Sequence, residues 1–96
     1  MSAIGVIATL RVQPGREAEF EAAFADLAAA VNADEPGNSY YRLFRGGEAG
    51  TYKVLECYDD EAAVAAHRAS AHYREIGARF SSLLAGAPDI ERLDAV

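Results

Sequence analysis

The chain has 96 residues, of which 51% are hydrophobic and 25% are charged, with three prolines, one cysteine and no tryptophan. This size and balance predict one packed domain over residues 1–96 and exclude a second catalytic domain or a disordered chain. Fifteen acidic residues against nine basic ones give a net charge of -6, which opposes binding to nucleic acid or to anionic membranes.

The sequence offers no stretch that approaches the roughly 18 consecutive apolar residues of a membrane span. Its first residues also lack a basic leader followed by a small-residue cleavage site. We therefore expect a cytoplasmic protein with neither a nucleic-acid partner nor a membrane partner. Cys57 has no second cysteine to pair with, and in a reducing compartment such a residue is expected to pack as a small core side chain.

Residues 4–12 alternate in character with a period of two, which predicts a strand. The second face of this strand carries no charge before Arg11, so we expect it to be covered on both sides. Pro14 and Gly15 end it. Residues 16–32 then change to helical spacing, with one apolar stripe made of Phe20, Phe24, Leu27 and Val31. Residues 32–37 have the composition of a turn.

Residues 38–45 and 51–58 are rich in aromatic and branched side chains and are joined by a glycine-rich segment, which predicts an antiparallel hairpin. In the second strand Glu56 shares a face with Tyr52, Val54 and Tyr58. A carboxylate in an aromatic row is unusual, and Glu56 is therefore the first residue that suggests chemistry.

Acidic residues at 59–61 predict the start of a helix that runs through His67 toward Ala69, after which Ser70 is suited to cap a second piece. That piece has helical apolar spacing and is expected to end near Gly86 and Pro88. Residues 90–96 are a candidate for a short closing strand.

The order strand, helix, strand, strand, helix, strand predicts an α+β fold, namely the ferredoxin-like βαββαβ arrangement with an antiparallel sheet and helices on one face. The other sheet face would be bare. Because an uncovered apolar sheet face favours aggregation, we expect a homodimer in which two such faces meet around a two-fold axis.

Several short segments, in this order, point to one family. They are Pro14-Gly15-Arg16-Glu17, Glu35-Pro36-Gly37 followed by Tyr41, Glu56-Cys57-Tyr58, and then His67 and His72. Together they resemble the antibiotic biosynthesis monooxygenase (ABM) domain, including the quinol monooxygenase type, over residues 4–84. The resemblance implies a dimeric α+β barrel with a pocket between sheet and helices. It also implies oxidation of phenols, anthrones or quinols by molecular oxygen with no metal, flavin or other cofactor.

The chain differs from some relatives whose fold resembles the one expected here. Haem-degrading relatives use a tryptophan and an asparagine in the pocket, whereas this chain has no tryptophan and carries Ala8 and Thr9 in its first strand. Haem cleavage is therefore disfavoured. The chain also lacks the tryptophan that some anthrone-oxidising members place near their substrate.

Glu56, His67 and His72 are the candidate catalytic residues. Glu56 is either a base tuned by desolvation or a structural carboxylate paired with His67. A histidine near the pocket is suited to accept a proton near neutral pH. Five positions on one continuous helix correspond to about 500°, so the two imidazoles are not expected to share a face, and no metal site is predicted.

Aromatic side chains are the candidate substrate contacts, because they can stack on an aromatic ring and tyrosine can also donate a hydrogen bond to its oxygen. These candidates are Tyr41, Tyr52, Tyr73, Phe20 and Phe24. We expect the partners of the site to be a small aromatic substrate and molecular oxygen. Two alternative functions are compatible with the same predicted fold. The chain could be a non-enzymatic dimeric module that binds a small ligand or a protein, or an isomerase or lyase that uses the same base.

Overall fold

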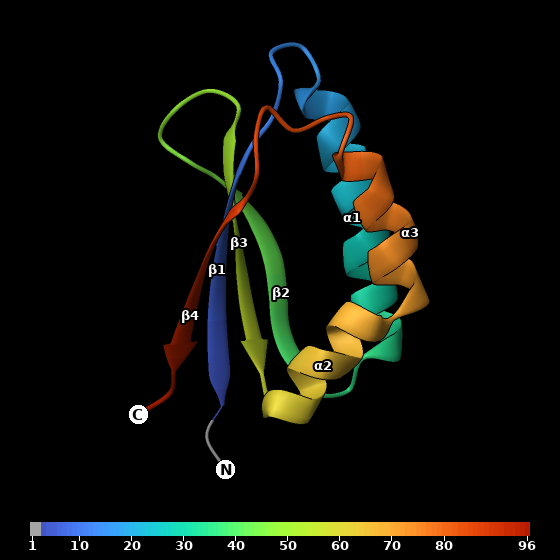
Figure 1. Ribbon diagram of the computed structural model, residues 1–96, viewed down its shortest axis with the longest axis vertical. Helices are drawn as coiled ribbons and strands as arrows, with labels where there is room; N and C mark the ends of the chain where they lie inside the picture. The colour runs from blue at the N-terminus through green and yellow to red at the C-terminus, as the bar shows by residue number, and fades with distance from the viewer. Residues whose placement is uncertain (1–2) are drawn as a thin grey trace.

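A four-stranded antiparallel sheet is covered on one face by three helices (Figure 1). The computed structural model describes residues 3–96. The strand order in the sheet is β2-β3-β1-β4, so that β1 pairs with both β3 and β4, as in the predicted ferredoxin-like α+β fold. The elements in chain order are β1 (Ile4–Arg11), α1 (Glu17–Asp34), β2 (Asn38–Arg45), β3 (Thr51–Tyr58), α2 (Glu61–Ala69), α3 (Ala71–Phe80) and β4 (Asp89–Asp94).

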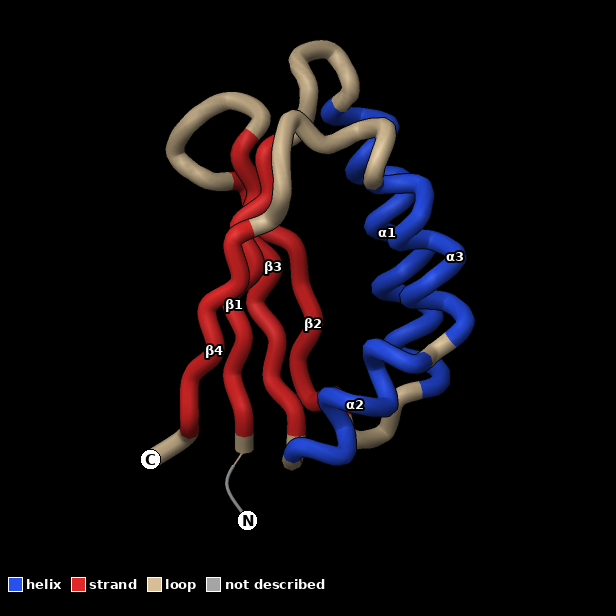
Figure 2. Tube along the Cα trace, viewed as in Figure 1, coloured by secondary structure: helices blue, strands red, loops and turns tan. Residues whose placement is uncertain are grey.

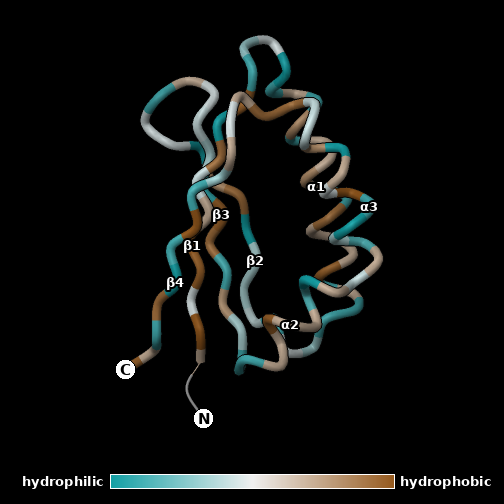
Figure 3. The backbone as a smooth tube through the Cα atoms, viewed as in Figure 1, coloured by the Kyte–Doolittle hydropathy of each residue, from teal (hydrophilic) through white to brown (hydrophobic). Residues whose placement is uncertain are grey.

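Strand β1 supplies the centre of the core. Its alternation sends Ile4, Val6, Ala8 and Leu10 toward the helices, where all four are buried. The strand is hydrophobic along most of its length (Figure 3). The opposite face is only half-buried at Gly5, Ile7 and Thr9 within the single chain, so the expected second cover is not supplied by residues 3–96.

Helix α1 packs on this face through the predicted stripe. Phe20, Phe24, Leu27 and Val31 are each at most 3% exposed. Burial of side chains of this size contributes about 1.5 to 3 kcal/mol each. The ring of Phe24 stacks on Tyr41 of β2 with a centroid distance of 5.4 Å, which ties the middle of α1 to the outer strand of the hairpin.

The third helix is shorter than its sequence pattern predicts. Helix α3 ends at Phe80 and not near Gly86, because the following residues bond back to the chain beyond β1. The amide of Gln13 donates to the carbonyl of Leu83, and Val12 forms a β-bridge with Leu84. The chain then returns along the sheet as β4.

Ser70 separates α2 from α3. Its backbone is extended, with φ -67° and ψ 148°, and its side chain serves both helices. The hydroxyl donates to the carbonyl of His67 at 2.6 Å and accepts from the amide of Tyr73 at 3.2 Å. This confirms the second cap predicted at Ser70, and Figure 2 shows the short non-helical break.

The sheet face away from the helices carries a mixture of apolar and charged side chains. Tyr40, Phe44 and Leu93 are 44%, 39% and 44% exposed on it, beside Arg42 and Lys53. Cys57 is also on this face and half-buried, so the expectation of a core cysteine was wrong. The reason is strand parity: with Glu56 and Tyr58 facing the helices, the residue between them must face away. Among residues 3–96 no helix is long and apolar enough to cross a bilayer.

Candidate active site

A cavity of about 650 Å³ lies between the helices and the covered face of the sheet. Its walls are mostly apolar and come from all three helices and from strands β1, β2 and β3, together with the loop before β4. A cavity of this size and character suits a small organic ligand. The charged and hydrogen-bonding side chains that line it are Tyr41, Glu56, Tyr58, His67, Arg68, Tyr73, Arg74 and Ser81.

Glu56 reaches the cavity from β3, where it lies opposite Val6 and Tyr41 in the sheet register. The hydroxyl of Tyr58 donates to its Oε1 at 2.5 Å. Burial raises the pKa of Glu56, and the hydrogen bond from Tyr58 and the charge of Arg68 act in the opposite direction. The alternative in which Glu56 pairs with His67 was wrong, because the carboxylate bonds to Tyr58 instead.

His67 projects from α2 into the same wall and is 3% exposed. Aromatic rings surround it, with centroid distances of 5.2 Å to Tyr41, 5.6 Å to Tyr58 and 4.8 Å to Tyr73. Its Nδ1 lies 2.9 and 3.0 Å from the two carboxylate oxygens of Glu35. Burial lowers the pKa of His67, and the contact with Glu35 raises it in part.

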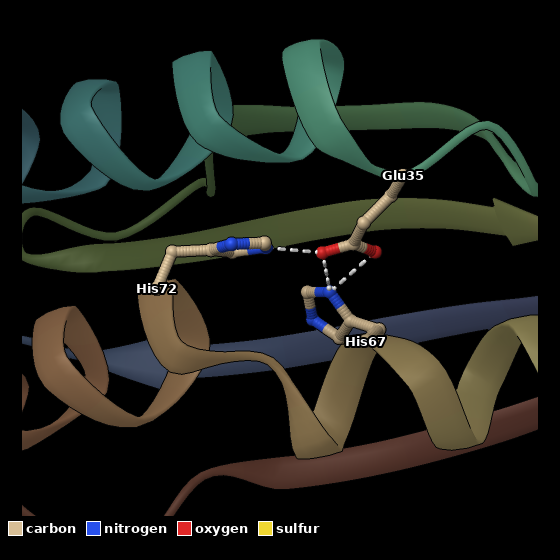
Figure 4. A group of neighbouring side chains, drawn as sticks. All are labelled: Glu35, His67 and His72. Carbon is tan, nitrogen blue, oxygen red and sulfur yellow. Dashed lines mark hydrogen bonds and ion pairs between the residues drawn. The ribbon is translucent and has the colours of Figure 1, made fainter.

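Glu35 follows the last residue of α1 and is shared by two histidines (Figure 4). Nε2 of His72, from α3, lies 2.5 Å from Oε2 of Glu35, and both imidazoles point at the same carboxylate. Burial alone would raise the pKa of Glu35. The hydrogen bonds from His72 and His67 outweigh burial and leave this pKa below its ordinary value.

The expectation that the two imidazoles diverge was wrong. It assumed one continuous helix, whereas the extended backbone at Ser70 reorients α3 relative to α2. Glu35, His67 and His72 each offer a ligand atom, and these atoms lie within 4.8 Å of one another. Two imidazole nitrogens and one carboxylate are a donor set that zinc or iron can use, so these three residues are the ones that could hold a metal ion.

The structure divides the predicted aromatic contacts into two groups. Tyr41, Tyr73 and Phe24 line the cavity. Phe20 and Tyr52 are not among its lining residues: Phe20 is fully buried in the core, and the hydroxyl of Tyr52 donates to Glu21 at 2.5 Å. Burial and the Glu21 carboxylate raise the pKa of Tyr52 to about 12. His72 likewise does not line the cavity: it bonds to Glu35, which in turn bonds to the lining residue His67.

Sequence reasoning did not single out Glu35 as a site residue. One signal was available, because a carboxylate just after the end of a helix faces the negative end of the helix dipole and needs a local partner. Arg68 and Arg74 were also missed. The sequence pattern does not distinguish these two arginines, because it predicts that both lie on the exposed faces of amphipathic helices. Only the tertiary structure places them at the cavity.

The fold and the cavity define a small α+β domain with an internal cavity of a size that suits a small organic molecule. A family model described as "Antibiotic biosynthesis monooxygenase" matches residues 3–79, and the chain belongs to this family. It is 34% identical over 88 residues to "Putative monooxygenase YcnE" of Bacillus subtilis (strain 168), a match that covers 91% of this chain and 92% of that protein.

Solved structures share the fold of this chain. The chain superposes with a TM-score of 0.97 and 50% identity on a crystal structure described as a "putative antibiotic biosynthesis monooxygenase" from Caulobacter crescentus CB15, covering 99% of this chain and 91% of that one. A conserved protein from Methanosarcina mazei Go1 gives a TM-score of 0.93 at 26% identity, covering 100% and 95% of the two chains.

Proposed function

We propose that the chain is a cofactor-independent monooxygenase that oxidises a hydroxylated aromatic, quinol or anthrone-type substrate with molecular oxygen inside this cavity. One observation carries the proposal: the half-buried carboxylate of Glu56 and the buried imidazole of His67 lie in the wall of an otherwise mostly apolar cavity of about 650 Å³. Such a site can remove a proton from an aromatic hydroxyl while it excludes bulk water.

The proposed chemistry needs little from the protein beyond deprotonation and orientation. Loss of the hydroxyl proton to a protein base leaves an electron-rich anion, which passes one electron to dioxygen. The substrate radical and superoxide then combine, forming a carbon–oxygen bond, and the resulting peroxide anion takes the proton back from the protein base to become a hydroperoxide. Loss of water then breaks the oxygen–oxygen bond and the carbon–hydrogen bond on the same carbon, which carries away the second oxygen atom and leaves a new carbonyl group. The substrate thereby supplies all the electrons that reduce dioxygen.

The remaining polar and aromatic groups have positions that suit this role. Tyr41, Tyr73 and Phe24 offer ring faces or edges for an aromatic substrate. Arg68 and Arg74 place guanidinium groups at the same cavity, where positive charge stabilises the substrate anion. Each of these assignments is part of the proposal.

The dimeric barrel that the family resemblance implies would cover the exposed face of the sheet. We propose that the exposed sheet face of two chains meets to form a homodimer, which would cover Tyr40, Phe44 and Leu93. The apolar side chains at the middle of this face, Ile7 and Leu55, are direct neighbours in the register of β1 and β3. We also propose that the protein acts in the cytoplasm.

Oxygen uptake tests the activity. Naphthohydroquinones and anthrones are supplied with and without protein, and the rates are corrected for autoxidation. Protein-dependent uptake that falls in Glu56→Gln and His67→Gln, but not in Glu19→Gln on the exposed surface of α1, supports the oxygenase. Uptake at the autoxidation rate across the panel would contradict it. If these compounds then raise the melting temperature without turnover, the chain is a binding module.

A further inference from the structure

We propose that Glu35 is a positioning residue that holds His67 with its proton on Nδ1, so that the unprotonated Nε2 faces the cavity and accepts the proton of the substrate hydroxyl. This inference rests on the proposed function and goes beyond it by choosing between the two candidate bases.

An ionised carboxylate can only accept hydrogen bonds. Both oxygens of Glu35 lie within 3.0 Å of Nδ1 of His67, so that nitrogen must carry the hydrogen. A neutral imidazole has one N–H, and its other nitrogen is then an acceptor. The contact therefore leaves the lone pair of His67 on Nε2.

The position of Nε2 agrees with this assignment. It forms no hydrogen bond to residues 3–96, and the only fully buried, unpartnered side-chain polar atom in that range is Oδ1 of Asn38. Nε2 of His67 therefore has no hydrogen-bond partner within residues 3–96 and is not fully buried. Since His67 lines the cavity, this nitrogen opens onto the space that a ligand would fill.

The carboxylate itself is held from several sides. His72 donates from Nε2 to Oε2 of Glu35 at 2.5 Å, and Asn38 approaches Oε1 through its amide nitrogen at 3.4 Å. Ser70 fixes the break that brings His72 to this point. The groups that orient His67 therefore come from the end of α1, from β2 and from α3.

Among the groups around His67, the Glu35 carboxylate favours proton uptake at this ring, whereas burial and the charges of His72 and Arg68 oppose it. When His67 becomes an imidazolium, the Glu35 carboxylate neutralises it at hydrogen-bond distance. Glu56 is less suited to be the base, since its Oε1 is already occupied by the hydroxyl of Tyr58. The titratable or charged groups packed around His67 are Glu35 at the end of α1, Tyr41 on β2, Tyr58 on β3, Arg68 on α2, and His72 and Tyr73 on α3.

Nitrogen-15 NMR of the histidine side chains tests the tautomer directly. The chain has only two histidines, so the spectrum of His67→Gln assigns both. We expect neutral His67 in the unsubstituted protein to carry its proton on Nδ1 and to leave Nε2 unprotonated. A proton found on Nε2 would overturn the inference, and this measurement does not require that any substrate be known.

Kinetics of Glu35→Gln, a change that conserves shape, test the consequence for the reaction. We expect kcat to fall by at least about 10-fold, approaching the 10² to 10⁴-fold expected for loss of the base itself in His67→Gln. The acid limb of the pH–rate profile should move to lower pH, since removal of the carboxylate lowers the pKa of His67. A purely structural role would not shift that limb.

Glu21→Gln is the matched control, because Glu21 is also a hydrogen-bonded carboxylate, with Tyr52 and Arg45 as its donors, but it lies on α1 away from the residues that line the cavity. An active enzyme whose kcat and acid limb are unchanged in Glu35→Gln would overturn the inference. So would a stoichiometric metal whose removal by a chelator abolishes uptake, which would make the cluster a metal centre. If the unsubstituted protein consumes no oxygen, the proposed function fails, and the NMR result alone decides whether Glu35 positions His67.

Discussion

Nδ1 of His67 lies 2.9 Å from Oε1 of Glu35, although the two residues are 32 positions apart in the chain. The contact joins the end of α1 to the end of α2 behind the wall of the cavity. Both side chains are less than a tenth exposed. An ionisable pair this well buried links the stability of the fold to the protonation of the site.

We expect the protein to lose stability as the pH falls below about 6.5. His67 has a lowered pKa when folded, so between that value and its ordinary value of about 6.5 the unfolded chain binds more protons, and stability rises with pH. Glu35, whose pKa is also lowered, adds a second loss as the pH falls below about 4.3. Thermal unfolding from about pH 2 to pH 8 measures both losses. If His67→Gln shows the same slope around pH 6 as the parent, His67 is not the group responsible.

Glu56→Gln should make the protein more stable at neutral pH. Burial raises the pKa of Glu56, so the folded protein binds more protons than the unfolded chain just above pH 4.3, and stability from this group declines as the pH rises through its folded pKa. The amide removes that cost and can still accept from Tyr58. Each kcal/mol gained corresponds to about 4 to 8 °C in Tm for a domain of this size. A variant that melts lower than the parent at pH 7.5 would contradict the expectation.

Gly77→Leu should block the cavity while the fold persists. Gly77 lies in the middle of α3 and lines the cavity, and a Cβ built there meets nothing within 4 Å. The leucine would occupy space that the substrate needs, so KM should rise or turnover should disappear. Gly77→Ala is the control, with activity largely kept and stability raised by about 0.5 to 1 kcal/mol through helix propensity. Unchanged kinetics in the leucine variant would place the substrate elsewhere.

Gly37→Ala should destabilise the contact between the α1–β2 turn and α2. A Cβ on Gly37 would lie 2.7 Å from Cβ of Ala63, and such overpacking costs about 1 to 3 kcal/mol. The companion change Ala63→Gly removes the clash, so the double variant should recover the part of the loss that is steric. Gly47→Ala, where a Cβ meets nothing within 4 Å, is the matched control. Urea unfolding supplies the three comparisons.

Leu55→Asp should produce a monomer. Leu55 is on the open sheet face next to Ile7, and a carboxylate there would be desolvated if two such faces met. We expect light scattering to give about twice the 10.2 kDa chain mass for the unsubstituted protein and the single chain mass for the variant. Glu48→Gln in the β2–β3 loop should leave the mass unchanged. A monomeric parent protein would remove the basis for the sheet-on-sheet assembly.

Local pattern was enough to predict the order and type of the elements of this protein, although not the end of α3. The hairpin strands agree with their predicted bounds, because alternation and glycine punctuation are properties of neighbouring residues. The apolar stripe of α1, the cap at Ser70 and the placement of Glu56 on the covered face follow from the same short-range periodicities. The element order then limited the topology to the ferredoxin-like fold.

The tertiary structure alone decided how the site is assembled. Whether His67 and His72 meet depends on the direction in which α3 leaves Ser70, and a helical angle computed along one axis cannot contain that turn. Glu35 joins them because α1 ends beside α2. The two residues Glu35 and His67 are 32 positions apart in the chain, so no local pattern could predict that they meet. The cavity, too, depends on how the helices pack on the sheet. Periodicity shows which side faces inward, but only packing decides how much space remains there.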